Sequence, residues 1–125
     1  MTRAGRLRLP PDVVLLLRGL HPDLKRRVRA ALDRMVAQPS AGKALRADLA
    51  GLRGFRVGRT RIVYRESSDV IEVVAVGPRE RIYEETLAIR GDPVLVREIR
   101  RGLRALRRTR KLYTLDELFA PAARR

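Results

Sequence analysis

The chain changes from a helical to an alternating pattern of apolar positions near residues 39–51. Before this boundary, apolar side chains recur three and four residues apart, which is typical of one buried helix face. The apolar residues of the longer predicted helix that share one face are Leu24, Val28, Ala31, Leu32 and Met35. We predict two helices, Pro11–Gly19 and Pro22–Gln38, each beginning with a proline that suits a first helical turn. Together they form a helical hairpin.

After the boundary, short apolar runs alternate with turn residues and predict β-strands. The expected strands are Phe55–Val57, Thr60–Glu66 and Val70–Val76, and the last is the most apolar. Near the N-terminus, Arg6-Leu7-Arg8-Leu9 alternates in the same way and predicts a first strand. The fold class is therefore α+β, in the order βααβββ, with the helical hairpin packed on one face of a small antiparallel sheet.

The alternation also predicts which way the strand residues face, because successive side chains point to opposite sides of a sheet. Ile62 and Tyr64 should face the helical hairpin, and Arg61 should face outward. By the same rule, Phe55 points inward and Arg56 outward. We therefore expect arginines to gather on the face opposite the hairpin. The alternative is that they are ordinary solvated strand residues.

Residues 91–125 form a second region, after a first region at residues 1–90. Asp92-Pro93 is typical of a helix start, and a narrow apolar stripe follows in an otherwise basic helix. The stripe consists of Leu95, Ile99, Leu103 and Leu106. Thr114-Leu115-Asp116-Glu117 is a capping box that opens a last short helix. Three interpretations are open for this extension: packing on the core or on another subunit, gripping a polyanion such as RNA, or covering in cis the face on which the arginines gather. We favour packing, because the apolar stripe needs burial.

Charge sets this chain apart from an average globular protein. Its 125 residues are 45% hydrophobic, which predicts one folded domain, yet 29 Lys+Arg against 14 Asp+Glu give a net charge of +15. A GC-rich genome also enriches arginine, but it does not explain acids at half the number of bases. The planar fork of arginine suits phosphate oxygens, and a high positive charge steers a protein toward polyanions. RNA is the expected partner.

Composition excludes several kinds of site. The chain has no cysteine, so it has no disulfide and no thiol nucleophile, and one histidine, His21, leaves no imidazole pair for zinc or a catalytic triad. We therefore expect no metal and no other cofactor. No apolar run reaches about 18 residues, and no signal peptide is evident at the start, which predicts a cytoplasmic protein without a membrane partner.

A set of short motifs stands out in their order along the chain: Gly42-Lys43-x-Leu45, Gly51, Arg56-Val57-Gly58-x-x-Arg61-x-Val63-Tyr64 and Val76-Gly77-x-Arg79-x-x-x-Tyr83. Each motif is weak alone, but their order and spacing are specific. Together they resemble the RelE family of bacterial toxins, over roughly residues 5 to 90. The resemblance implies a toxin of a type II toxin–antitoxin system, which cleaves messenger RNA in the ribosomal A site. The related ParE branch shares the fold but acts on gyrase, and Tyr83 favours the RelE branch.

The resemblance implies an endoribonuclease that needs no metal, in which a ribose 2′-hydroxyl attacks its own 3′ phosphate. Arg61 and Arg79 match positions that clamp the scissile phosphate, and Arg56 matches a basic position on the neighbouring strand. Tyr83 is expected to stack on a base or assist proton transfer. Further RNA contacts are expected from five basic residues: Lys43, Arg46, Arg53, Arg59 and Arg81.

The general base is left open by the sequence. Arginine, with a pKa of about 12.5–13.8, is a poor proton acceptor at neutral pH. The remaining candidates are Asp48, Glu80 and Tyr83, whereas His21 is expected to be a surface residue at a helix start. Weak or ribosome-dependent activity is therefore expected. The alternatives are a non-catalytic ParE-like toxin acting on gyrase, and a basic nucleic-acid-binding module.

A separate, acidic antitoxin is the expected partner beside messenger RNA and the ribosome. The family implies an antitoxin that supplies an amphipathic segment to the toxin. Residues 91–125 hold ten Lys+Arg and four Asp+Glu, so this extension would be repelled by an arginine cluster. We expect it to pack beside the core and leave Arg61 open.

Overall fold

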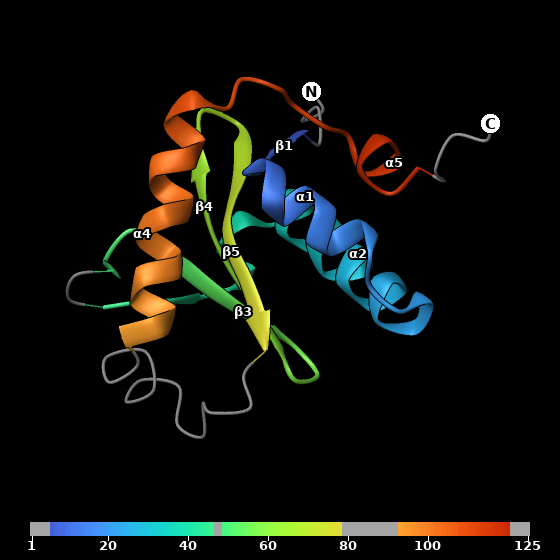
Figure 1. Cartoon of the computed structure of the whole chain (residues 1–125), viewed down its shortest axis with the longest axis horizontal. Helices are drawn as coiled ribbons and strands as arrows, with labels where there is room; N and C mark the ends of the chain where they lie inside the picture. The colour runs from blue at the N-terminus through green and yellow to red at the C-terminus, as the bar shows by residue number, and fades with distance from the viewer. Residues whose placement is uncertain (1–5, 47–48, 79–92, 121–125) are drawn as a thin grey trace.

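The computed structural model describes residues 6–46, 49–78 and 93–120. A five-stranded sheet lies at its centre, in the order β1-β5-β4-β3-β2 (Figure 1). The strands are β1 (Arg6–Arg8), β2 (Lys43–Ala44), β3 (Arg53–Val57), β4 (Thr60–Ser67) and β5 (Val70–Pro78). The three strands expected after the helices are confirmed, as is the first strand.

Two helical layers flank the sheet (Figure 1). The helices are α1 (Pro11–Arg18), α2 (Pro22–Ala37), the 3-10 turn η1 (Pro39–Ala41), α4 (Pro93–Arg108) and α5 (Leu115–Leu118). The predicted α+β class and the predicted helical hairpin, α1 and α2, are thus confirmed. His21 caps α2, because its Nδ1 accepts a hydrogen bond from the Asp23 N–H at 3.4 Å. Within the described ranges, no helix is long and apolar enough to cross a membrane.

The sheet is mixed rather than wholly antiparallel. β1 pairs in parallel with β5, with Leu7 opposite Ile71, whereas the other pairs are antiparallel. The sequence pattern does not reveal this pairing, because the helical hairpin and three strands separate β1 from its partner. The two-residue strand β2 was not predicted either, since two residues are too few to show an alternation.

The hairpin covers one face of the sheet with the larger apolar core. Leu17 on α1, Leu32 and Met35 on α2, and Ile62 and Tyr64 on β4 are all fully buried there. Ile62 and Tyr64 therefore face the hairpin, as their places in the alternation predict. Phe55 and Val57 pack against the same core, in agreement with the expected parity of β3.

The opposite face is covered by α4. Ile99 and Leu106 of this helix are buried against Val63 and Val74 of the sheet. The expectation that the extension packs on the core is confirmed. β4 and β5 are consequently buried on both faces, and α4 is part of the fold rather than an appendage.

A glycine allows α4 to approach β5 this closely. The register of β4 and β5 shifts between Val63 and Tyr64, so that Val74 has no partner in the ladder. A Cβ placed on Gly102 would lie 1.9 Å from the Val74 carbonyl oxygen. Any side chain at Gly102 would therefore push the helix away from the strand.

The chain returns to the hairpin side after α4. Leu7 and Tyr113 exchange two backbone hydrogen bonds, 2.7 and 2.8 Å long, which attach the extension to the edge of β1. Thr114 and Glu117 form the predicted capping box of α5. Leu118 is then fully buried in the hairpin-side core, where the Arg18 Nε donates to its carbonyl at 2.8 Å.

Gly102→Ala should destabilise the protein, although alanine favours a helix over glycine by about 1 kcal/mol. The added methyl collides with backbone that has no room to give, and overpacking of this kind costs about 1–3 kcal/mol or more. Urea unfolding measures the change. Gly77→Ala is the matched control, because a Cβ on Gly77 meets nothing within 4 Å. Equal stability of Gly102→Ala and the parent protein would show that α4 does not seat on Val74 in solution.

Candidate nucleic-acid interface

Two of the predicted arginines face each other across β3 and β4. Arg56 and Arg61 are direct cross-strand partners on the antiparallel ladder, so their side chains emerge on the same face. This is the face opposite the hairpin, because Phe55 and Ile62, the neighbouring pair, belong to the hairpin-side core. The predicted juxtaposition of Arg56 and Arg61 is confirmed.

A hollow of about 300 Å³ opens beside this pair. Its lining consists of Ala41, Lys43, Leu45, Gly54, Phe55, Arg56 and Arg61. Lys43 reaches the hollow from β2, which pairs with β3 so that Lys43 lies opposite Gly54. Three of the predicted basic residues, Lys43, Arg56 and Arg61, therefore line one cavity, named the β3–β4 hollow below.

Arg61 differs from the expectation in one respect: it is not open to solvent. It is only 4% exposed, whereas Arg56 is exposed. Arg61 lies on a central strand, and its Nη1 sits 3.9 Å from the position that a Cβ on Gly54 would occupy. The Arg61 side chain therefore lies over Gly54 of β3 instead of standing out into water. The prediction of an outward, open Arg61 was right about the face and wrong about its exposure.

Tyr64 holds the backbone that carries Lys43. Its hydroxyl accepts a hydrogen bond from the Gly42 N–H at 2.7 Å and donates one to the Pro39 carbonyl at 2.8 Å. Arg53 adds a third bond, from its Nη1 to the Gly42 carbonyl at 2.8 Å. A Cβ on Gly42 would lie 2.6 Å from the Tyr64 hydroxyl oxygen, so only glycine fits. The sequence analysis missed this network, although a tyrosine in a buried strand signals that its hydroxyl needs a partner.

Burial raises the pKa of Tyr64 above its usual 10.0, while the Gly42 N–H and the nearby Arg53 charge lower it by less. The phenol therefore stays neutral in the folded protein. Because the Tyr64 hydroxyl accepts a bond from the Gly42 N–H and donates its proton to the Pro39 carbonyl, it has a structural role in the fold.

The other predicted RNA-binding residues are dispersed. Arg53 lies opposite Tyr64, on the hairpin side of the sheet. Arg59 is exposed at the β3–β4 turn, and Arg46 is exposed just after β2. Neither Arg46 nor Arg59 lines the β3–β4 hollow.

Several predicted site residues lie outside the described residues. They are the catalytic candidates Arg79 and Tyr83, the RNA-binding candidate Arg81, and the general-base candidates Asp48 and Glu80. The described lining of the β3–β4 hollow contains neither a carboxylate nor an imidazole. No group of three or more potential metal ligands occurs in the part of the chain that the structure describes. The β3–β4 hollow, as far as its lining is described, is therefore a cationic cavity suited to binding an anion.

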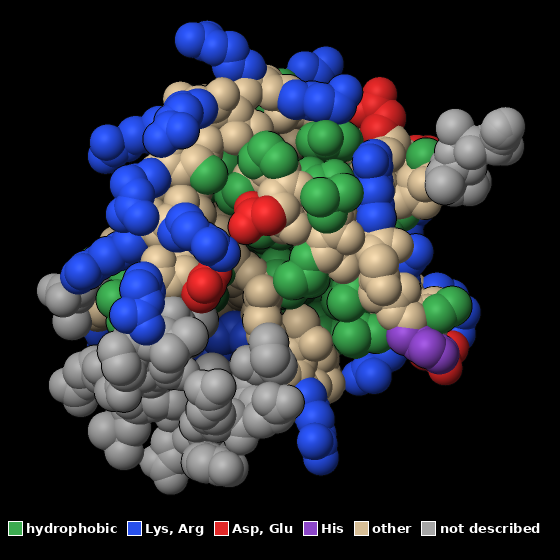
Figure 2. All heavy atoms as spheres, viewed as in Figure 1, with side chains coloured by type: hydrophobic (Ala, Val, Ile, Leu, Met, Phe, Trp, Pro, Cys, Tyr) green, Lys and Arg blue, Asp and Glu red, His purple; other side chains and the backbone are tan. Residues whose placement is uncertain are grey.

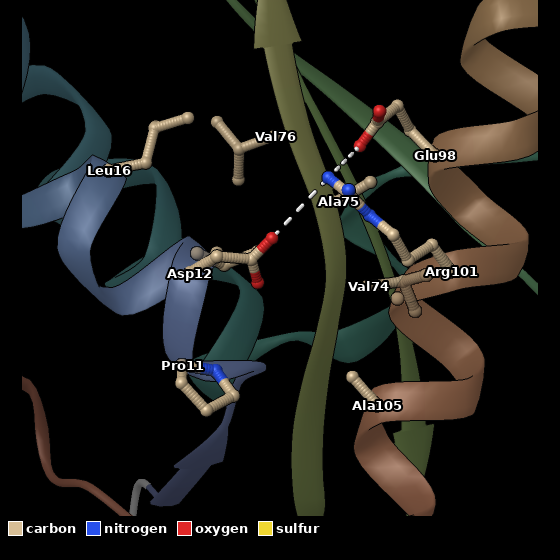
Figure 3. A pocket seen from close by; sticks show the side chains of 11 residues that line it. Pro11, Asp12, Leu16, Val74, Ala75, Val76, Glu98, Arg101 and Ala105 are labelled. Atoms are coloured by element: carbon tan, nitrogen blue, oxygen red, sulfur yellow. Dashed lines mark hydrogen bonds and ion pairs between the residues drawn. The ribbon is translucent and has the colours of Figure 1, made fainter.

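A second hollow, of about 400 Å³, lies between α1 and α4 with β5 as its floor (Figure 3). Arg101 of α4 bridges it, pairing with Asp12 of α1 at 3.5 Å and with Glu98 at 2.8 Å. Beside it, Leu15 and Leu16 of α1 are 71% and 42% exposed, large values for leucine. Figure 2 shows apolar side chains gathered on this part of the surface.

The protein has an α+β fold with a cationic hollow on its sheet, and a comparison with known families identifies the class of protein to which the chain belongs. Residues 20–83, just over half of the chain, match the family model described as the ParE toxin of the type II toxin–antitoxin system parDE. The chain therefore belongs to the ParE toxin family, within the RelE/ParE superfamily of type II toxins. Membership implies a cognate antitoxin. No curated protein and no solved structure matches the chain significantly.

Tyr64→Phe should lower the free energy of unfolding by about 1–3 kcal/mol, because it leaves the Gly42 N–H and the Pro39 carbonyl without their partner. It should also change the alkaline limit of stability. The pKa of Tyr64 is higher in the folded protein than the usual 10.0, so the tyrosine of the unfolded chain ionises at a lower pH than that of the folded protein. The contribution of Tyr64 to stability is therefore fully present below pH 10.0 and is lost as the pH rises through the folded-state pKa. Denaturant titrations from about pH 8 to 11, on either side of the usual tyrosine pKa, measure both effects, and Tyr113→Phe is the control. A Tyr64→Phe protein with unaltered stability at neutral pH would contradict the role assigned to this network.

Proposed function

We propose that this toxin acts on RNA, cleaving messenger RNA on the ribosome by attack of a ribose 2′-hydroxyl on the adjacent phosphate. The attack forms a 2′,3′-cyclic phosphate and breaks the P–O5′ bond, and the 5′-oxygen of the downstream fragment leaves as a hydroxyl after taking up a proton. The observation that supports the proposal is the placement of Lys43, Arg56 and Arg61 around one hollow on the sheet. Three cations converge there on a space large enough for a phosphate group and part of its nucleotide.

The reaction suits a site of this kind. Nucleophile and phosphate belong to the same nucleotide, so catalysis requires alignment and stabilisation of the added negative charge. Arg61 is buried, and a charge in a low-dielectric position interacts more strongly with an oxyanion than the same charge in water. Arg56, exposed beside it, is suited to guide the phosphate into the hollow. We assign Arg61 to the scissile phosphate and Arg56 to its capture.

We assign proton transfer to groups elsewhere, because the described lining of the hollow contains neither a carboxylate nor an imidazole. Under the proposal, Arg79 also contacts the phosphate and Tyr83 stacks on a base or transfers a proton. The ribosome completes the site by holding the message in a reactive geometry. Activity on free RNA should therefore be weak.

A second candidate function is inhibition of gyrase without RNA cleavage. Two observations favour it: the family match is to the ParE toxin, and the described lining of the β3–β4 hollow contains neither a carboxylate nor an imidazole. In that case the basic face serves as a protein- or DNA-binding surface. The two candidates differ in a directly measurable product, cleaved messenger RNA.

For the cognate antitoxin, we propose an acidic amphipathic segment that binds over α1. Leu15 and Leu16 are exposed apolar side chains, and large exposed apolar groups on a small protein mark interaction sites. The net charge of +15 favours an acidic partner. The extension itself is already packed on the core through Ile99 and Leu118, so it is not free to serve as that segment.

Arg56→Gln should reduce messenger cleavage about tenfold, the lower end of what electrostatic capture of a charged substrate contributes, with little change in stability because Arg56 is exposed. Primer extension on translated messages after induction without antitoxin measures cleavage, and thermal melting checks folding. Arg34→Gln, an exposed arginine of α2 on the hairpin side, is the matched control and should keep full activity.

The same induced cultures separate the two candidates. Gyrase supercoiling assays with the purified parent protein are run in parallel. Intact messages together with inhibited supercoiling would reject RNA cleavage and select the gyrase-directed function. Cleavage that survives Arg56→Gln unchanged would remove the β3–β4 hollow from the mechanism.

A further inference from the structure

A third hollow, of about 430 Å³, lies at the C-terminal end of α4, apart from the β3–β4 hollow. Its lining consists of Arg8, Arg65, Glu72, Leu106, Arg107, Thr109 and Arg110. Four arginines and one carboxylate leave this cavity a formal charge of +3. It is called the α4-end hollow below.

Glu72 organises the floor of this hollow. The residue lies on β5, paired in register with Arg8 of β1 on one side and Arg65 of β4 on the other. Arg8 Nη1 donates to Glu72 Oε2 and Arg65 Nε donates to Oε1, both at 2.6 Å. The carboxylate is 4% exposed, against 28% for Arg8 and 39% for Arg65. A buried acid thus holds two half-open guanidinium groups side by side.

The hollow retains unused hydrogen-bond donors. Each guanidinium has five N–H groups, and Glu72 accepts one from each of Arg8 and Arg65. The Nε of Arg8 is buried and has no partner among the described residues. An unpaired buried donor is unfavourable, and a bound oxyanion would satisfy it. Arg107 and Arg110 form no ion pair with any carboxylate that the structure describes, so their charges are available too.

We propose that the α4-end hollow binds a phosphate group, held by Arg8 and Arg65 from the sheet and by Arg107 and Arg110 from the end of α4. Planar guanidinium groups match phosphate oxygens with paired hydrogen bonds, which makes an arginine cluster selective for this ligand chemistry. The phosphate belongs either to a nucleic-acid backbone or to a small phosphate compound. The site is separate from the proposed cleavage site, and neither depends on the other.

Helix stability alone does not account for this arrangement. Arginines in the last turn of a helix offset the negative end of its dipole, which explains Arg107 and equally Arg108. Arg108 does not line the hollow, however, whereas Arg110 does so from beyond the helix end. Figure 2 shows basic side chains gathered along α4, on the side of the molecule away from α1. The hollow lies at the C-terminal end of this helix, so an extended polyanion could contact both.

The first experiment compares Arg107→Gln/Arg110→Gln with Arg104→Gln/Arg108→Gln. Both pairs remove two exposed arginines and one last-turn charge from the same region, but only the first pair lines the hollow. Melting temperatures are measured as inorganic phosphate replaces chloride at constant ionic strength. Phosphate should stabilise the parent and the Arg104/Arg108 variant to the same extent, through binding to the folded state. The Arg107/Arg110 variant should lose this phosphate-dependent rise in melting temperature. A rise in melting temperature that is equal in all three proteins would overturn the proposal.

The second experiment identifies the source of the phosphate, using a fluorescent single-stranded RNA at several salt concentrations. If the backbone of RNA fills the hollow, the Arg107/Arg110 variant should bind it about tenfold more weakly than the control pair. Its log–log salt dependence should also become shallower, by about 0.7 for each phosphate that the variant no longer neutralises. If the two variants bind RNA equally, but phosphate fails to raise the melting temperature of the Arg107/Arg110 variant alone, the hollow binds a small phosphate compound. An equal decrease of both properties in the two variants would show a diffuse charge effect and reject the site.

Discussion

The central strands β4 and β5 carry apolar side chains on both faces, and this is the constraint on which the rest of the structure depends. The helical hairpin covers only one of these faces, with Leu17 and Leu32 against Ile62 and Tyr64. Val63 and Val74 on the other face would stay in water without Ile99 and Leu106 of α4. Full burial of such a side chain stabilises the fold by about 1.5–3 kcal/mol, so α4 contributes to stability by covering Val63 and Val74.

This double burial also decides where charge is placed. Arginines cannot occupy the parts of the sheet that α4 covers, so they lie at its margins: Arg56 and Arg61 where β3 meets β4, and Arg8 and Arg65 near the end of α4. At the first margin the Arg61 side chain lies over Gly54, and at the second Glu72 pairs with both Arg8 and Arg65.

Two close contacts at glycines fix how the helices and strands pack against each other. Gly102 brings α4 against the Val74 carbonyl, and Gly42 brings η1 and β2 against the Tyr64 hydroxyl. In each case a missing Cβ lets two elements approach more closely than any other residue would allow. The family match over residues 20–83 includes both Gly42 and Tyr64, whereas Gly102 lies beyond it, in the C-terminal extension. The extension is therefore held against the sheet by a close contact of its own, between Gly102 and Val74.

The sequence by itself determined the local features of this protein. Helical periodicity defined α1 and α2, and turn residues separated β3, β4 and β5, because these patterns depend on neighbours within a few positions. Pleat parity was enough to place Arg56 and Arg61 on the same face. Only the tertiary structure decided the burial of Arg61, the parallel pairing of β1 with β5 and the Arg8–Glu72 ion pair. Arg8 and Glu72 are 64 residues apart, and no local periodicity records a contact made at that separation.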